Sequence, residues 1–267
     1  MINYTRLLRL SVAALASLLL VGGCGTTETG EPTSRQSGSS SQSAQAAPIT
    51  VFAAASLTEA FTQIGTDFEA KSGSAVTFNF GSSSTLATQI NQGAPANVFA
   101  AANPTTMKTV TDAGGADTAV DFVSNTLQIA VPTGNPGKIT GLRDFADESK
   151  TIAICAPQVP CGAAAVNVFA AAKITPKPDT LEADVKATLA KVAADEVDAA
   201  LVYRTDVIAA SDDVEGIEFP ESGQAVNTYP IAVLTESKTA DVAQAFVDHV
   251  LSPEGQAVLQ KAGFAQP

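Results

Sequence analysis

Apolar and polar positions follow two different periods from Ile49 onward. Short apolar runs, typical of buried strands, are separated by segments with the three-to-four-residue spacing of amphipathic helices. The apolar runs predict strands at Thr50–Ala54, Ala75–Phe80, Asn97–Ala101, Leu127–Pro132, Thr151–Cys155, Ala199–Tyr203, Gly216–Phe219 and Tyr229–Leu234. The helical spacing predicts helices at Leu57–Lys71, Ser84–Gln92, Pro104–Ala113, Gly162–Lys173, Asp184–Ala194 and Ala240–Ala262. This alternation predicts an α/β fold around parallel sheets.

Two of these strands run directly into short, hydroxyl-rich turns that open helices, in AAASLTEAF and GSSSTLATQI. In the first turn, the run from Ser56 to Glu59 predicts a capping box in which Glu59 bonds back to the N–H of Ser56. Neither turn contains lysine or arginine. The first four N–H groups of a helix lack partners and carry the positive end of its dipole. The two turns therefore predict a site for a small oxyanion that is held by hydrogen bonds and not by opposite charge.

The polar stretches between strands predict two lobes. Asp121–Thr126 precedes one strand, and Pro220–Thr228 is a polar loop before another. If the chain crosses at both places, residues 49–126 and 227–267 form lobe I and residues 127–226 form lobe II. Two lobes joined by hinge strands enclose a cleft, which is typical of a closing binding protein.

The composition limits the classes of partner. The chain has 267 residues, of which 45% are hydrophobic, so two modest domains with real cores are possible. A net charge of −12 argues against a nucleic-acid partner, whose phosphates need a basic face. An anion site is still compatible with this charge, because exposed charges more than about 10 Å away are largely screened. The single histidine, His249, leaves little material for a metal site, and no free metal cation is expected.

The N-terminal segment is expected to direct export. Arg6 and Arg9 precede the apolar run Leu10–Val21, which is shorter than the ~20 residues that a transmembrane helix needs. The run ends in LVGGC, which resembles the lipobox of bacterial lipoproteins, so residues 1–24 are expected to be a signal peptide with lipid on Cys24. The alternative is an ordinary secretory signal with an incidental cysteine. Residues 25–48 contain almost nothing that could be buried and are expected to be a flexible tether. The protein is then expected outside the cell membrane, anchored to its outer face.

Two further cysteines, Cys155 and Cys161, lie close together in the sequence. A pair of cysteines in an exported protein favours a disulfide, here between a strand end and a helix start. A metal or redox pair is the alternative. It is less favoured because the spacing is not CxxC and no histidine lies nearby.

Five segments, in this order and spacing, resemble the periplasmic molybdate-binding proteins of ABC importers: AAASLTEAF, GSSSTLATQI, GAPANVFAAA, VPCGAAA and ALVYRTD. The resemblance covers nearly all of residues 49–267. It implies the fold of a type II periplasmic binding protein, with two α/β lobes joined by hinge strands and a tetrahedral oxyanion between them.

The resemblance also implies five ligand-binding residues, matched motif by motif. Ser56, Ser83 and Tyr203 would act through their hydroxyls, and Cys161 and Val185 through their backbone N–H groups. The family often has a small residue where this chain has Cys161. The departure does not threaten a backbone contact, and a disulfide there would stiffen that wall of the site.

The function that follows from the resemblance is capture of molybdate, and of tungstate, for an ABC importer permease. It implies a monomer with no enzymatic activity, no cofactor and no nucleic-acid partner. The same fold with sulfate, thiosulfate or phosphate is an alternative. Ferric iron is less favoured, because such proteins use neighbouring tyrosines and this domain has only Tyr203 and Tyr229. A hydrolase is disfavoured because no G-x-S-x-G is present and the single histidine is poorly placed for a triad. A purely structural or adhesive lipoprotein is the remaining alternative.

Overall fold

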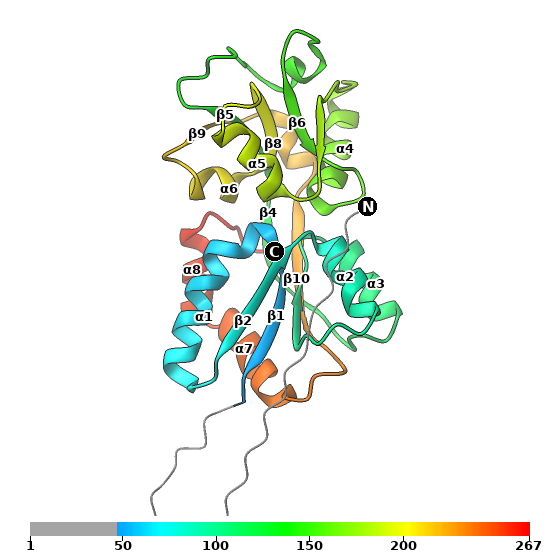
Figure 1. Ribbon diagram of the computed structural model, residues 1–267, viewed down its shortest axis with the longest axis vertical. Helices are drawn as coiled ribbons and strands as arrows, with labels where there is room; N and C mark the ends of the chain where they lie inside the picture. Colours follow the sequence, from blue (N-terminus) through cyan, green and yellow to red (C-terminus); the bar gives the residue numbers. More distant parts are fainter. Residues whose placement is uncertain (1–46) are drawn as a thin grey trace, which may run out of the picture. The chain divides into compact units, whose positions relative to one another are not determined.

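The computed structural model describes residues 47–267 (Figure 1). The predicted signal peptide, most of the predicted tether and Cys24 lie outside the described residues. Among the described helices, none is long and apolar enough to cross a membrane.

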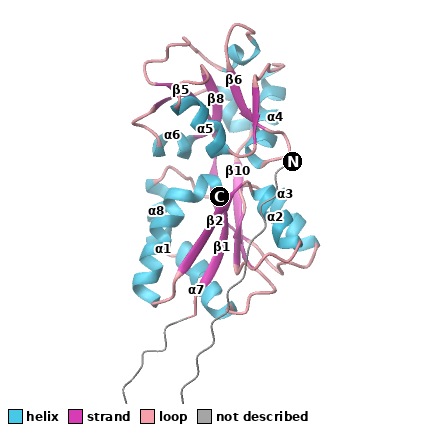
Figure 2. Ribbon diagram, in the orientation of Figure 1, coloured by secondary structure: helices cyan, strands magenta, loops and turns pink. Residues whose placement is uncertain are grey.

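The described chain contains two five-stranded sheets (Figure 2). The first has the order β2-β1-β3-β10-β4, with β1 (Ile49–Ala54), β2 (Val76–Gly81), β3 (Val98–Ala100), β4 (Val120–Asn125) and β10 (Asn227–Val233). The second has the order β7-β6-β8-β5-β9, with β5 (Leu127–Pro132), β6 (Ile152–Cys155), β7 (Thr180–Glu182), β8 (Ala199–Tyr203) and β9 (Val214–Ile217). In each sheet the first three strands of the order are parallel, and the fourth runs antiparallel to its neighbours. The two sheets therefore share one topology.

Each sheet and its helices form one lobe (Figure 1). Lobe I is the first sheet with α1 (Thr58–Ser72), α2 (Ser83–Asn91), α3 (Pro104–Asp112), α7 (Ala240–Leu251) and α8 (Pro253–Lys261). Lobe II is the second sheet with α4 (Pro160–Ala172), α5 (Val185–Ala193) and α6 (Arg204–Ala209). Short 3-10 turns lie at Ala55–Leu57, Leu142–Ala146 and Pro220–Gln224. The chain passes from lobe I to lobe II between β4 and β5 and returns between β9 and β10. The residue boundaries given above for the lobes stay a prediction.

The sheet of lobe I is buried on both faces. Val51 and Ala53 of β1 pack in one cluster with residues of α1, α7 and α8, among them Phe246. Phe52 and Phe99 pack on the opposite face in a second cluster with residues of α2 and α3. Because both faces are covered, β1 and β3 are apolar at nearly every position, which explains why they were recognisable in the sequence.

The structure corrects three of the predicted elements. The single helix expected at Ala240–Ala262 is two helices, because Ser252 has an extended backbone and Pro253 begins α8. Part of the stretch expected as a polar boundary is strand β4, which pairs with β10 and whose Phe122 and Val123 are buried. The strand expected at Gly216–Phe219 begins two residues earlier, at Val214. The short elements β7 and α6 were not predicted.

Candidate functional site

A small cavity lies between the two lobes, at the carboxyl ends of parallel strands of both sheets. Its volume is about 20 Å³, somewhat more than the roughly 10–15 Å³ that one water needs. This position, outside the strand ends of open α/β sheets, is where such folds bind ligands. The cavity brings together all five residues that were matched by motif: Ser56, Ser83, Cys161, Val185 and Tyr203. Their role as ligands stays a prediction.

Ser56 lies in the 3-10 turn between β1 and α1 and is buried, with 3% of its surface exposed. The predicted capping box is wrong, because the residue before α1 is Leu57 and no side chain caps this helix. The carboxylate of Glu59 instead accepts hydrogen bonds from Lys186 of lobe II. The Oγ of Ser56 lies 2.9 Å from the hydroxyl of Tyr229, at the start of β10.

Three consecutive serines follow β2, and each has a different environment. The Oγ of Ser83 accepts a hydrogen bond from the N–H of Ala102 at 3.0 Å. The hydroxyl of Ser84 donates to the carbonyl of Gln158 in lobe II at 2.8 Å. The Oγ of Ser82 is buried and has no hydrogen-bond partner among the described residues, although it lines the cavity. A buried hydroxyl without a partner is rare, and here it favours a polar guest.

The wall in lobe II is formed by two helix starts. Helix α4 begins at Pro160, so the N–H of Cys161 is one of the first four, which have no helical partner. Helix α5 begins at Val185, whose N–H is unpaired within the helix for the same reason. Asp184 also lines the cavity, but its Oδ1 caps α5 by accepting from the N–H of Ala187 at 2.9 Å. The wall thus offers two main-chain donors with a fixed direction.

A disulfide joins Cys155, at the end of β6, to Cys161. Their Cα atoms are 5.8 Å apart. The next residue, Gly162, lies so close to the preceding turn that a Cβ there would be 1.9 Å from the carbonyl oxygen of Ala156. The bridge and the close approach together hold the start of α4, and with it the N–H of Cys161, in one position.

Tyr203 ends β8 and is 1% exposed. Its hydroxyl oxygen accepts a hydrogen bond from Nδ2 of Asn227 at 2.6 Å. Asn227 is the first residue of β10 and also donates to the carbonyl of Ala102 at 2.9 Å. Burial raises the pKa of Tyr203 well above its ordinary value, so the phenol keeps its proton and can donate it to a guest.

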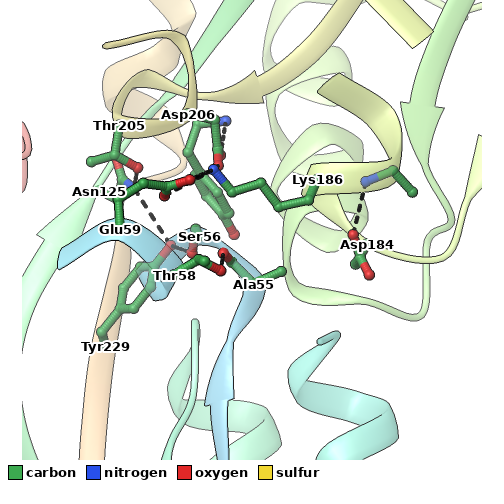
Figure 3. A network of polar contacts seen from close by, with 12 residues as sticks. Ala55, Ser56, Thr58, Glu59, Asn125, Asp184, Lys186, Thr205, Asp206 and Tyr229 are labelled. Atoms are coloured by element: carbon green, nitrogen blue, oxygen red, sulfur yellow. Dashed lines mark hydrogen bonds and ion pairs between the residues drawn. The ribbon is translucent and has the colours of Figure 1, made fainter. Parts of the chain in front are cut away.

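A lysine lies next to the site in sequence but is neutralised by two carboxylates (Figure 3). The Nζ of Lys186 lies 2.8 Å from Glu59 of lobe I and 3.3 Å from Asp206 of lobe II. Burial by itself would lower the pKa of Lys186, but the two carboxylates outweigh it and raise that pKa. Asp206 is fully buried, and burial raises its pKa to about 6. Among the described residues that line the cavity, there is no lysine and no arginine.

Some polar residues behind the cavity were not singled out by the sequence. Ser82 lies in the hydroxyl-rich turn but was not among the five residues matched by motif, and Tyr229 entered only as an argument against iron. Asn125 and Asn227 had no local signal, because each lies in a polar stretch at the edge of a strand. Only contacts between segments far apart in the sequence bring these side chains to the site.

The chain is similar to a family of known proteins in both sequence and structure. The model of the family described as bacterial extracellular solute-binding protein matches residues 49–265. The "Molybdate-binding protein ModA" of Mycobacterium tuberculosis strain H37Rv is 40% identical over 255 residues, which cover 95% of this chain and 97% of that protein. The ModA of Escherichia coli strain K12 is 34% identical over 233 residues, or 81% of this chain and 88% of that protein. The solved structure of the Azotobacter vinelandii periplasmic molybdate-binding protein has a TM-score of 0.69 at 22% identity, covering 82% of this chain and 99% of that one.

Proposed function

The chain belongs to the family of bacterial extracellular solute-binding proteins, and we propose that it binds molybdate and delivers it to an ABC importer. Relatives that share 34% and 40% of its residues over most of their length are molybdate-binding proteins by name. One observation carries the proposal most directly: the five residues matched by motif line a single cavity between the lobes. We extend the proposal to tungstate, which has the same charge and shape.

Uncharged donors are sufficient to hold a dianion. A hydrogen bond to a charged partner contributes roughly 1.5–3 kcal/mol. Five of them would give about 10 kcal/mol before the costs of ordering and closure, and micromolar binding needs about 8 kcal/mol. Ser56 and Ser83 would donate from lobe I. Cys161, Val185 and Tyr203 would donate from lobe II. Donors in fixed positions on helix starts and buried strands also select anions by size. Long, flexible lysine or arginine side chains would adapt to anions of different sizes.

Closure of the lobes would couple binding to delivery. Contacts between the lobes include the hydrogen bond from Ser84 to Gln158 and the ion pair between Lys186 and Glu59. These contacts belong to an arrangement in which the lobes touch beside the cavity. An anion that bonds to both lobes favours this arrangement over an open one, because it gains fewer bonds when the lobes separate. The importer permease would then recognise the closed form.

The proposal also covers where the protein acts and how it is anchored. The protein would act outside the cytoplasm as a monomer, with lipid on Cys24; an ordinary secretory signal is the alternative. Mass spectrometry of the membrane-bound protein, with Cys24→Ser as the control, distinguishes the two.

The protein would not be an enzyme, since the imidazole of His249 does not line the cavity and lies against the ring of Phe68, with centroids 5.8 Å apart.

Sulfate, thiosulfate and phosphate are the competing ligands, because all are tetrahedral or nearly so. Isothermal titration calorimetry with molybdate, tungstate, sulfate and phosphate separates them. We expect molybdate and tungstate to bind and the smaller anions to bind much more weakly. Equal affinity for sulfate would contradict the proposed selectivity. If no anion gives a heat of binding and none raises the melting temperature, a structural lipoprotein is favoured.

A further inference from the structure

We propose that Tyr229, Asn227 and the main chain of Ala102 are positioning groups that direct the protons of Ser56, Tyr203 and Ser83 into the cavity. Each of these groups occupies a lone pair of the ligand-binding hydroxyl, so that the hydroxyl's own hydrogen is free to point at the guest. The inference rests on the proposed function, and it assigns roles to residues behind the first layer of the site.

The simplest case is Ser83. The N–H of Ala102 donates to its Oγ at 3.0 Å, and a backbone N–H can only donate. Ser83 is 1% exposed, so water does not compete freely for this oxygen. Its proton therefore remains available for an acceptor in the cavity.

Tyr203 depends on the orientation of the Asn227 amide. Nδ2 of Asn227 lies 2.9 Å from the carbonyl oxygen of Ala102, which can only accept, so this atom must be the nitrogen. The same nitrogen lies 2.6 Å from the hydroxyl of Tyr203. The phenolic oxygen is thus an acceptor toward Asn227, and its proton is available to the cavity that Tyr203 lines, with the hydroxyl of Tyr229 as the competing acceptor.

Ser56 is set through a longer chain of contacts (Figure 3). Oδ1 of Asn125 accepts from the N–H of Thr126 at 3.0 Å, which turns Nδ2 toward Thr205 at 2.8 Å and toward the hydroxyl of Tyr229 at 3.5 Å. The Tyr229 oxygen lies near the NH₂ group of this amide. The Oγ of Ser56 lies 2.9 Å from the same oxygen, a distance at which either hydroxyl can donate, and we assign the donated proton to Tyr229. Tyr229 is fully buried, and burial raises its pKa, which keeps that proton in place. Ser56 then donates to the guest.

The consequence is a site with donors and almost no acceptors. Of the described residues along the cavity, Asp184 is the one carboxylate, and its Oδ1 is occupied by the N–H of Ala187. The open acceptors along the cavity are the second carboxylate oxygen of Asp184 and the Oγ of Ser82, so the hydrogen of a protonated anion is paired only if it points to one of these two positions. In any other orientation that hydrogen is left unpaired, which is costly in a buried site. The protein should therefore prefer a fully deprotonated dianion to a hydrogen-bearing dianion of the same size and charge.

Selenate and arsenate provide this comparison. At mildly alkaline pH both are tetrahedral dianions of similar size, but arsenate still carries one proton. We expect the wild-type protein to bind selenate at least about tenfold more tightly than hydrogen arsenate, the difference that one unpaired buried group makes.

The variant Tyr229→Phe tests the positioning role. It keeps the ring that packs against Phe122 and Phe264 and removes only the hydroxyl. Ser56 can then turn and offer a lone pair to the cavity, so we expect molybdate affinity to fall about tenfold and the preference for selenate to shrink. The matched control is Ser124→Ala on the neighbouring strand β4. It removes a buried hydroxyl that donates to the carbonyl of Gln266, and it should change neither the molybdate affinity nor the preference for selenate.

Calorimetry on the full chain separates the possible results. If the wild type binds molybdate but does not distinguish selenate from hydrogen arsenate, the donor-only site is wrong while the proposed function stands. If Tyr229→Phe loses affinity with its selenate preference intact, Tyr229 supports the fold only, and the positioning role is wrong. If the wild type binds no molybdate at all, the proposed function itself fails.

Discussion

The two walls of the cavity present the same kind of donor by different means. Lobe I would use the side-chain hydroxyls of Ser56 and Ser83, which line the cavity in turns that follow β1 and β2. Lobe II would use the main-chain N–H groups of Cys161 and Val185 and the hydroxyl of Tyr203, all from residues that line the cavity. Hydroxyl donors depend on which residue stands at the position. Main-chain donors depend only on where a helix begins, so a cysteine at position 161 is compatible with the proposed main-chain contact.

Removal of both serines of lobe I should have the largest effect on molybdate affinity. Ser56→Ala with Ser83→Ala takes two hydrogen bonds from the anion, and at roughly 1.5–3 kcal/mol each we expect a loss of affinity of at least about 100-fold. Calorimetry with molybdate measures it, and Thr62→Ala on the exposed face of α1 is the control. A loss of less than about threefold would mean that lobe I does not hold the anion through these hydroxyls.

The buried carboxyl behind the wall of lobe II should be visible in the pH dependence of stability. Asp206 accepts from the N–H of Tyr203, and its pKa of about 6 lies above the ordinary 3.8. Between these values the folded protein holds a proton that the unfolded chain has released. The stability from this group is therefore present below pH 3.8 and lost as pH rises through about 6.

Asp206→Asn should remove this dependence. Relative to the variant, the wild type should lose about 3 kcal/mol of unfolding free energy across that range, since one pKa unit corresponds to about 1.4 kcal/mol. Denaturant unfolding at a series of pH values gives the difference. Parallel curves for the two proteins would show that Asp206 titrates normally.

Opening the disulfide should loosen lobe II and leave lobe I unchanged. A bridge over a short loop contributes on the order of 2 kcal/mol, so Cys155→Ala with Cys161→Ala should lower the unfolding free energy by about that amount. Molybdate affinity should fall a few-fold because the N–H of Cys161 is held less firmly. If affinity is unchanged while stability falls, the bridge supports the lobe and does not set the donor.

A proline at the start of α5 tests main-chain donation most directly, although its expected effect is the smallest because it removes a single N–H. Proline is favoured at the first helical position, and the extended Asp184 before it is compatible with proline. Val185→Pro therefore removes one N–H with little change to the helix, and we expect about tenfold weaker binding of molybdate. Val185→Ala keeps the N–H and should bind nearly as well as the wild type. Equal binding by both variants would exclude this N–H as a ligand.

The sequence predicted most strands, because strand–turn–helix units are local. The resemblance to molybdate-binding proteins supplied five of the residues that line the cavity. The capping box failed because Glu59 has a stronger partner in Lys186, which comes from the other lobe. The split between α7 and α8 had a local signal in Ser252 and Pro253, but apolar periodicity continues across it. Helix α6 is only six residues long, too short to show a helical period.

The polar network behind the site had no sequence signal of its own. Tyr229 and Asn227 lie behind the cavity because β10 returns to lobe I between β3 and β4. The contact between Tyr229 and Ser56 joins residues 173 positions apart. Such partners follow from topology and register, and neither composition nor periodicity contains them.

A crystal structure of the molybdate complex, with molybdenum located by anomalous scattering, tests the central claim most directly. We predict one molybdenum atom between the two lobes, with its oxygens bonded to the hydroxyls of Ser56, Ser83 and Tyr203 and to the N–H groups of Cys161 and Val185. Molybdenum bound elsewhere, or oxygens held by the ammonium of Lys186, would contradict the account.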